Sequence, residues 1–130
     1  MKFLCLVCAD THMERMSDVD AEQHFADYAE FTAAIRASGH FVGCNRLQPP
    51  ATAVTVRVRN GRISTTDGPF AETKEQLGGY YLIEARDLDE AILIASRIPG
   101  SRVGSVEVRP VAEDAKTLEA LGFATSHVAR

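Results

Sequence analysis

The chain has 130 residues and a net charge of −4 at neutral pH, with 45% hydrophobic and 25% charged residues. A chain of this length forms a single domain that buries about two thirds of its unfolded surface, so it needs neither disulfides nor a metal to fold. The acidic balance argues against a protein that binds nucleic-acid phosphates, and no apolar run approaches the roughly 18 residues that span a bilayer. We therefore expect a cytoplasmic protein with no nucleic-acid or membrane partner.

The first predicted strand spans residues 3–8 and contains the sequence Cys5-Leu6-Val7-Cys8. Its short apolar run ends at Asp10 without a small-residue cleavage pattern, so we interpret it as a buried strand and not as a signal peptide. The C-x-x-C spacing is a redox or zinc signature in other contexts. On a strand, however, residues three apart point to opposite faces. We expect Cys5 and Cys8 to be inert thiols.

A long helix is predicted from Asp18 to Gly39, because the apolar period changes at its start and glycine is a common residue just after a helix. Histidine changes charge near neutral pH and serves as a base, an acid or a ligand. His24 lies with Tyr28, Phe31 and Ile35 at the edge of the apolar stripe, where core and solvent meet. The stripe itself consists of Ala21, Phe25, Tyr28, Thr32 and Ile35.

A short strand over residues 41–47 precedes a β-hairpin. Residues 54–59 and 62–66 alternate in polarity around Asn60-Gly61, which is typical of a two-residue type I′ turn. One face then carries Val54, Val56, Val58, Ile63 and Thr65, and the other carries Thr55, Arg57, Arg59, Arg62, Ser64 and Thr66. Two alternatives remain for the arginines: a solvated edge that charge keeps soluble, or contact with carboxylates of a second subunit.

The stretch from Asp67 to Tyr81 separates two strands and concentrates ionisable side chains, namely Asp67, Glu72, Lys74 and Glu75. Asp67-Gly68-Pro69 favours a turn, and Gly78-Gly79 permits close approach of a backbone or ligand. As a site, its carboxylates would act as acid and base or bind a metal, while Lys74 or Arg57 would hold an anionic group. As structure, Asp67 would form an Asx-turn beside a solvated turn. We expect no dedicated metal centre and no cofactor.

The remaining elements complete the order β-α-β, hairpin, β-α-β, which is typical of a ferredoxin-like α+β fold with an extra hairpin. They are a strand over residues 80–85, a helix over 87–98 with capping-box spacing from Asp87 to Glu90, and a strand over 103–109. We assign residues 1–111 to this domain. Residues 112–130 form an extension with a short helix and a loose end.

The motif DGPFAETKEQLGGYYLIEARDLDEA, together with LQPPATAVTVRVRNG before it and GSVEVRPV after it, closely resembles the DGPF-domain branch of the YCII-related family. The resemblance covers roughly residues 1–111. It implies a ferredoxin-like fold with two helices on one face of the sheet, which pairs into a dimeric α+β barrel. Most members of the family have no assigned reaction.

The string Glu22-Gln23-His24-Phe25 looks like the helix histidine of the wider family, in which a histidine–aspartate pair has been suspected as an active site. The resemblance implies that Asp67 is the most plausible aspartate here. A carboxylate in such a pair fixes the histidine tautomer and increases its basicity.

Two classes of function stay open. The first is a small enzyme or ligand-binding protein, with an acid–base pair of His24 and Asp67 and a pocket that also contains Tyr80. Its ligand would be small, with an anionic group held by Arg57 or Lys74. The predicted ligand-binding residues are Arg57, Glu72, Lys74, Glu75 and Tyr80. The second is a non-catalytic dimeric module accessory to a transcription regulator, since family members are often associated with sigma-factor-like proteins. In both cases we expect a homodimer, because a ferredoxin-like sheet leaves one face uncovered.

Overall fold

The computed structural model describes residues 1–10, 15–71 and 74–123. Its centre is a four-stranded antiparallel sheet in the order β2-β5-β1-β6. This order confirms the ferredoxin-like α+β fold. The strands of the sheet are β1 (Lys2–Ala9), β2 (Phe41–Arg46), β5 (Gln76–Glu84) and β6 (Ser105–Pro110).

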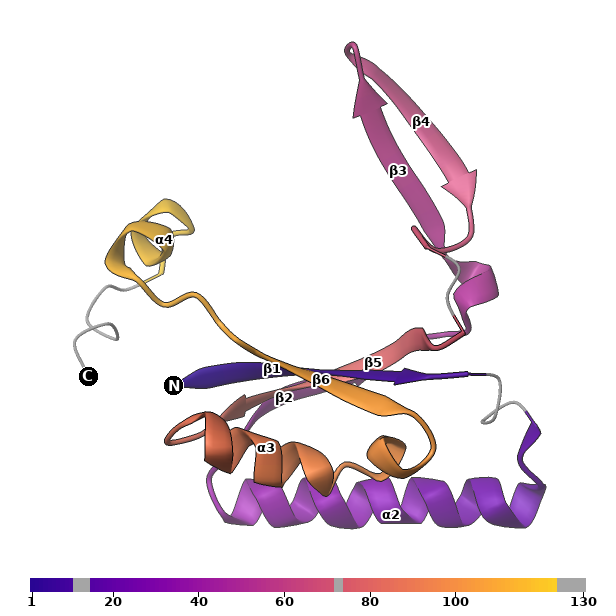
Figure 1. Cartoon of the computed structure of the whole chain (residues 1–130), viewed down its shortest axis with the longest axis vertical. Coiled ribbons are helices and arrows are strands. Elements are labelled where there is room, and N and C mark those ends of the chain that lie inside the picture. The colour runs from indigo at the N-terminus through magenta and orange to yellow at the C-terminus, as the bar shows by residue number, and fades with distance from the viewer. Residues whose placement is uncertain (11–14, 72–73, 124–130) are drawn as a thin grey trace.

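Two helices, α2 (Asp18–Ala37) and α3 (Leu88–Ser96), pack on one face of the sheet (Figure 1). Each begins at a side-chain cap: Ser17 accepts a hydrogen bond from the Asp20 amide at 3.2 Å, and Asp87 accepts one from the Glu90 amide at 2.9 Å. Such caps satisfy amides that have no partner within the helix. A short 3-10 helix, η2 (Pro99–Arg102), joins α3 to β6. None of the helices in the described ranges is long and apolar enough to cross a membrane.

The core lies between the helices and one face of the sheet. Phe3, Cys5 and Val7 alternate inward from β1 and pack with Tyr81 and Ile83 of β5. The buried face of α2 is the predicted edge of the stripe, because His24, Phe31 and Ile35 are buried while Phe25 of the stripe is exposed. The helix is therefore rotated so that the edge residue His24 faces inward.

Neither α2 nor α3 covers the opposite face of the sheet, and of the described helices the short α4 (Ala115–Ala120) lies on that side (Figure 1). Leu4 and Leu6 of β1 and Tyr80 and Leu82 of β5 alternate onto this face and are half-buried. The sequence predicted residues 3–8 as a buried strand. Within the described protomer, α2 and α3 cover only one side (Figure 1).

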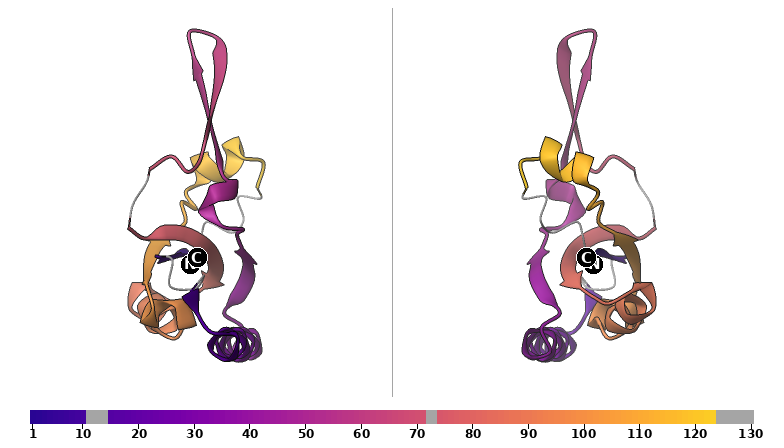
Figure 2. Two further views of the ribbon diagram at one scale, coloured as in Figure 1. Left: turned by 90° about the vertical axis from the view of Figure 1, so that its right-hand side faces the viewer. Right: turned by 90° about the vertical axis from the view of Figure 1, so that its left-hand side faces the viewer.

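The hairpin of β3 (Val54–Arg59) and β4 (Arg62–Asp67) is a separate two-stranded sheet. Asn60 and Gly61 both have positive φ angles, 53° and 72°, as a type I′ turn requires. The predicted register is confirmed, with Val58 opposite Ile63 and Arg59 opposite Arg62. The hairpin projects far from the body on the side away from α2 and α3 (Figure 2).

Strand β5 begins at Gln76, four residues before the predicted start, so Gly78 and Gly79 lie within the strand. A Cβ atom at Gly79 would lie 2.8 Å from the carbonyl oxygen of Asn45 on β2. The expected close backbone approach is therefore made by the neighbouring strand. After β6, the predicted short helix is α4 (Ala115–Ala120).

Cys5 and Cys8 are free thiols on β1; Cys5 is buried, and Cys8 is half-buried. Burial raises the pKa of Cys5 to about 11, and burial together with the charges of Glu75 and Glu107 raises the pKa of Cys8. Because the thiolate is the reactive species, we expect neither thiol to react with a maleimide at pH 7 until the protein is unfolded, with partial labelling confined to Cys44. Mass spectrometry of the labelled native protein checks this. Rapid native labelling of Cys5 would contradict the inward position of its side chain.

Candidate pocket at the first half of helix α2

A pocket of about 250 Å³ lies between the first half of α2 and the end of the sheet. His24, Phe25 and Tyr28 line it from the helix, and Tyr81 lines it from β5. Gly100 of η2 lines the wall beneath Tyr28. Most of the lining atoms are apolar, with a few polar groups among them, which is the usual composition of a small-molecule site.

His24 is the buried polar side chain of this pocket, with 7% of its surface exposed and its Nε2 atom buried. Its ring meets the Tyr28 ring edge to face, with 5.0 Å between the centroids. Both residues project from one side of α2 because they are four positions apart. An imidazole held in this way can donate or accept a proton at a ligand that enters the pocket.

Two tyrosines supply hydroxyl groups next to His24. The Tyr28 hydroxyl accepts a hydrogen bond from the Gly100 amide at 3.0 Å, and the Tyr81 hydroxyl shares one with Thr32 at 2.7 Å. The two phenol rings are nearly parallel, with centroids 6.3 Å apart. Burial raises the pKa of both phenols above the usual value, so both stay protonated at neutral pH. The sequence prediction placed Tyr28 on the apolar stripe of the helix and gave Tyr81 no role in a site. The position of Tyr28 four residues after His24 on one helix was the available signal.

A cation lies in the wall of the pocket at the edge of the sheet. The guanidinium carbon of Arg46 lies 5.1 Å from the centre of the Phe25 ring. Both side chains are exposed, and the ring holds the arginine in position through a cation–π contact. The pocket therefore combines a buried imidazole, neutral phenols and a positive group.

Gly100 has no side chain, which leaves room for Tyr28 in the wall of the pocket. A Cβ atom at this position would lie 2.6 Å from both the Tyr28 hydroxyl oxygen and Cγ1 of Val7. Real Cβ contacts are essentially never that short, so a side chain at position 100 would displace one of these neighbours. The glycine thereby permits the hydrogen bond between the backbone and Tyr28.

Tyr80 and Asp67, the predicted partners of His24, do not lie together in the structure. Tyr80 lines the pocket, but the alternation of β5 puts its side chain on the open face, where its hydroxyl accepts a hydrogen bond from Asn45 at 2.7 Å. Asp67 is exposed at the end of β4, opposite Val54 at the base of the hairpin. It does not line the pocket. The structure does not bring Asp67 to His24 within one protomer.

The predicted ligand-binding residues of the loop are also dispersed. Arg57 lies over the Phe70 ring at 5.5 Å, on the hairpin. Lys74 is exposed, and Glu75 accepts a hydrogen bond from the hydroxyl of Ser105 at 2.6 Å. Glu72 lies outside the described residues. None of the described members of this set lines the pocket at His24.

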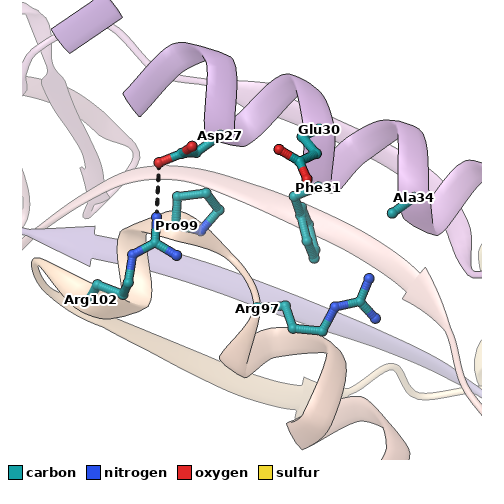
Figure 3. A pocket seen from close by; sticks show the side chains of 7 residues that line it. All are labelled: Asp27, Glu30, Phe31, Ala34, Arg97, Pro99 and Arg102. Carbon is teal, nitrogen blue, oxygen red and sulfur yellow. Dashed lines mark hydrogen bonds and ion pairs between the residues drawn. The ribbon is translucent and has the colours of Figure 1, made fainter. Parts of the chain in front are cut away.

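A second, larger depression of about 470 Å³ lies between α2 and the segment from α3 to η2 (Figure 3). Phe31 forms its floor, and Arg102 pairs with Asp27 at 3.1 Å across one end. Arg97 and Glu30 extend along its exposed sides. Because charged side chains in water line most of this depression, we interpret it as a solvated groove between two packed helices and not as a binding site.

Ser38, His40 and Glu90 form a chain of contacts at the end of α2. The Ser38 hydroxyl lies 2.7 Å from Nδ1 of His40, and Nε2 of His40 lies 3.4 Å from Glu90. The order serine, histidine, carboxylate resembles that around a nucleophilic serine, but Ser38 is the C-cap of α2. A helix C-terminus carries partial negative charge, which opposes an alkoxide. We interpret these contacts as a cap that connects α2 to α3.

The described residues contain no group of three histidine, cysteine, aspartate or glutamate side chains arranged to hold a metal ion. The polar groups of the pocket are instead suited to hydrogen bonding and to contact with an anion.

Comparison with known proteins identifies a matching family and a curated relative. The family model described as the YCII-related domain matches residues 1–114. A curated relative, "Uncharacterized protein R00369" of Rhizobium meliloti (strain 1021), is 49% identical over 69 residues. That match covers 52% of this chain and 56% of the relative, so it spans little more than half of either protein.

Proposed function

The chain belongs to the YCII-related family, and from this premise we propose that it is a homodimeric protein that binds a small, largely apolar anion in the pocket at His24. His24 then serves as the proton donor or acceptor toward the ligand, and Arg46 balances the negative charge. This proposal retains the histidine of the predicted acid–base pair. It does not require Asp67.

The observation that carries the proposal is the burial of an ionisable imidazole at a pocket. His24 is 7% exposed and lines the pocket, so its ring can meet a ligand there. Its ring meets the Tyr28 ring, and the pocket beside it has a volume of about 250 Å³ and a mostly apolar wall. Pockets with a few convergent polar groups on an apolar wall are where ligands bind in proteins of known function.

The dimer is supported by the open face of the sheet. Leu4, Leu6 and Leu82 are half-buried there, and neither α2 nor α3 covers them. A contiguous apolar sheet face on a small protein is typical of an interface. A second copy of the chain offers the same flat face, as a two-fold axis requires.

Benzoate is a suitable first probe, because it combines an apolar ring with one carboxylate. We expect Arg46→Gln to weaken benzoate binding up to about fivefold, since an ion pair to an exposed charge is worth about 0.2–1 kcal/mol. Arg36→Gln is the matched control, because Arg36 lies 4.0 Å over the Phe41 ring and does not line the pocket. NMR titration gives both dissociation constants.

A second pair of variants compares the loss of the histidine in the pocket with the loss of a histidine outside it. His24→Gln should abolish benzoate binding, whereas His40→Gln, outside the pocket, should leave it unchanged. Benzyl alcohol, which has no charge, should bind the wild-type protein more weakly than benzoate. Equal affinity of all four variants for benzoate would contradict the pocket.

The second candidate function is a non-catalytic dimeric module accessory to a transcription regulator. The hairpin β3–β4 favours it, because its exposed apolar face is of the kind that binds protein. Absence of binding by both probes, with an intact dimer, would make this the better hypothesis.

A further inference from the structure

The hairpin of residues 54–67, here called the arm, extends from the body on the side of the sheet that α2 and α3 do not cover (Figures 1 and 2). Its register defines two faces. The valine face consists of Val54, Val56, Val58, Ile63 and Thr65. The arginine face consists of Thr55, Arg57, Arg59, Arg62, Ser64 and Thr66.

The valine face is exposed along its full length. Val56 retains 61% of its accessible surface and Ile63 retains 76%, although both alternate onto the same side as Val54 and Val58. Scattered exposed apolar residues are normal, but a continuous stripe of four apolar β-branched residues on a projecting element is not. Apart from marginal contacts, the arm packs on no other helix or strand of the described chain.

The arginine face is partly covered by the chain itself. Arg57 lies over the Phe70 ring, and the Thr55 hydroxyl donates to the Gly68 carbonyl at 2.9 Å. The Gly68 amide donates to Ala53 at 2.7 Å and closes the base of the arm. The turn that follows Asp67 therefore occupies one side of the base and leaves the valine face open to a partner.

An isolated two-stranded hairpin is marginally stable in water, and it becomes stable when a further layer covers its apolar face. The six-residue strands of the arm have no such layer in the described protomer. A surface outside the described residues would supply it.

We propose that the valine face of the arm packs against a second copy of this chain and that the two arms of the homodimer clamp the two bodies together. This inference rests on the dimer of the proposed function, and it assigns to that dimer an interface that the open sheet face does not provide.

Interface area is the first argument for a second copy as the occupant. Four strands about 4.8 Å apart, paired over about six residues of about 3.3 Å each, make a face of roughly 400 Å², whereas a stable interface buries about 800 Å² per partner. The open sheet face alone is too small. Each arm adds roughly 200 Å² of its own and covers as much on the partner.

Charge is the second argument. The arm contains three arginines and one aspartate, a balance of +2, in a chain whose net charge is −4. The rest of each copy therefore carries −6. An arm that lies on the body of another copy brings opposite charges together, and Arg59 and Arg62, which face each other on the arm, would be compensated there.

The test uses sedimentation velocity over a range of concentrations. Val56→Thr with Ile63→Thr keeps β-branched residues in the arm but removes apolar groups from the valine face. We expect this variant to raise the dimer dissociation constant at least tenfold. The control, Val19→Thr with Leu93→Thr, removes exposed apolar groups from α2 and α3 and should leave the constant unchanged.

Circular dichroism of each variant verifies that the body is folded, and hydrogen exchange of the arm amides gives a second measurement. In the wild type, exchange in residues 54–67 should slow as the dimer forms. A dimer that is equally stable in the arm variant, equal weakening by the control, or a monomeric wild type would each overturn the inference. Benzoate binding at His24 is measured on the same samples, so failure of the arm is distinguishable from failure of the pocket.

Discussion

Ile83→Ala is expected to lower the free energy of unfolding by about 2–5 kcal/mol, the usual cost of deleting buried branched groups from a core. Ile83 has no exposed surface. It lies in β5 between β1 and β2 and pairs directly with Phe3 and Phe41. The cavity left by alanine therefore opens where three strands and the helix layer meet.

Ile92→Ala provides the control for this substitution. Ile92 has the same side chain, but it is 49% exposed on α3, so its truncation should cost less than about 1 kcal/mol. Urea unfolding of both variants at one protein concentration measures the difference and keeps the contribution of a dimer constant. Equal costs at the two positions would contradict the position of Ile83 in the core.

The fold could be predicted from the sequence because each element carries a local signal. The arm is the clearest case: alternation around Asn60-Gly61 determined the turn type, the register and the faces, and all three are confirmed. The capping of α3 by Asp87 was predicted for the same reason. Such features depend on residues close in the sequence, where backbone geometry leaves few choices.

The rotation of α2 could not be predicted in the same way. Phe25 and His24 are adjacent, and on hydrophobicity alone phenylalanine is the better core residue. The structure buries His24 because the aromatic edge contact with Tyr28 and the space beside Gly100 lie on that side of the helix. Tyr28 lies on the same helix, but the space beside Gly100 comes from a segment distant in the sequence, so the composition of α2 does not reveal it.

The candidate site shows the same limit. The sequence singled out His24 and Tyr80, and both line the pocket. Asp67 was chosen for its place in a turn, yet the hairpin carries it to the base of the arm. The many charged residues after Asp67 indicated a loop. They did not indicate how far that loop lies from His24 on α2.

Gly104→Ala is expected to destabilise the protein by about 3 kcal/mol, at the upper end of the cost of adding a methyl group to a packed region. A Cβ atom at Gly104 would lie 2.1 Å from the carbonyl oxygen of Cys8 and 2.9 Å from Cα of Ala9. These are backbone atoms of β1, which cannot move aside by a change of rotamer. Either β1 shifts or the connection from η2 to β6 does.

The same substitution should weaken benzoate binding, because Ala9 and Val103, the neighbours of this contact, line the pocket at His24. Gly43→Ala is the matched control, since a Cβ atom at Gly43 on β2 would meet nothing within 4 Å. Urea unfolding and benzoate titration of the two variants give both effects. If Gly104→Ala is as stable as Gly43→Ala, then β1 and the start of β6 are farther apart than the structure has them. If Gly104→Ala loses stability but binds benzoate with unchanged affinity, then the contact at Gly104 does not position the wall of the pocket.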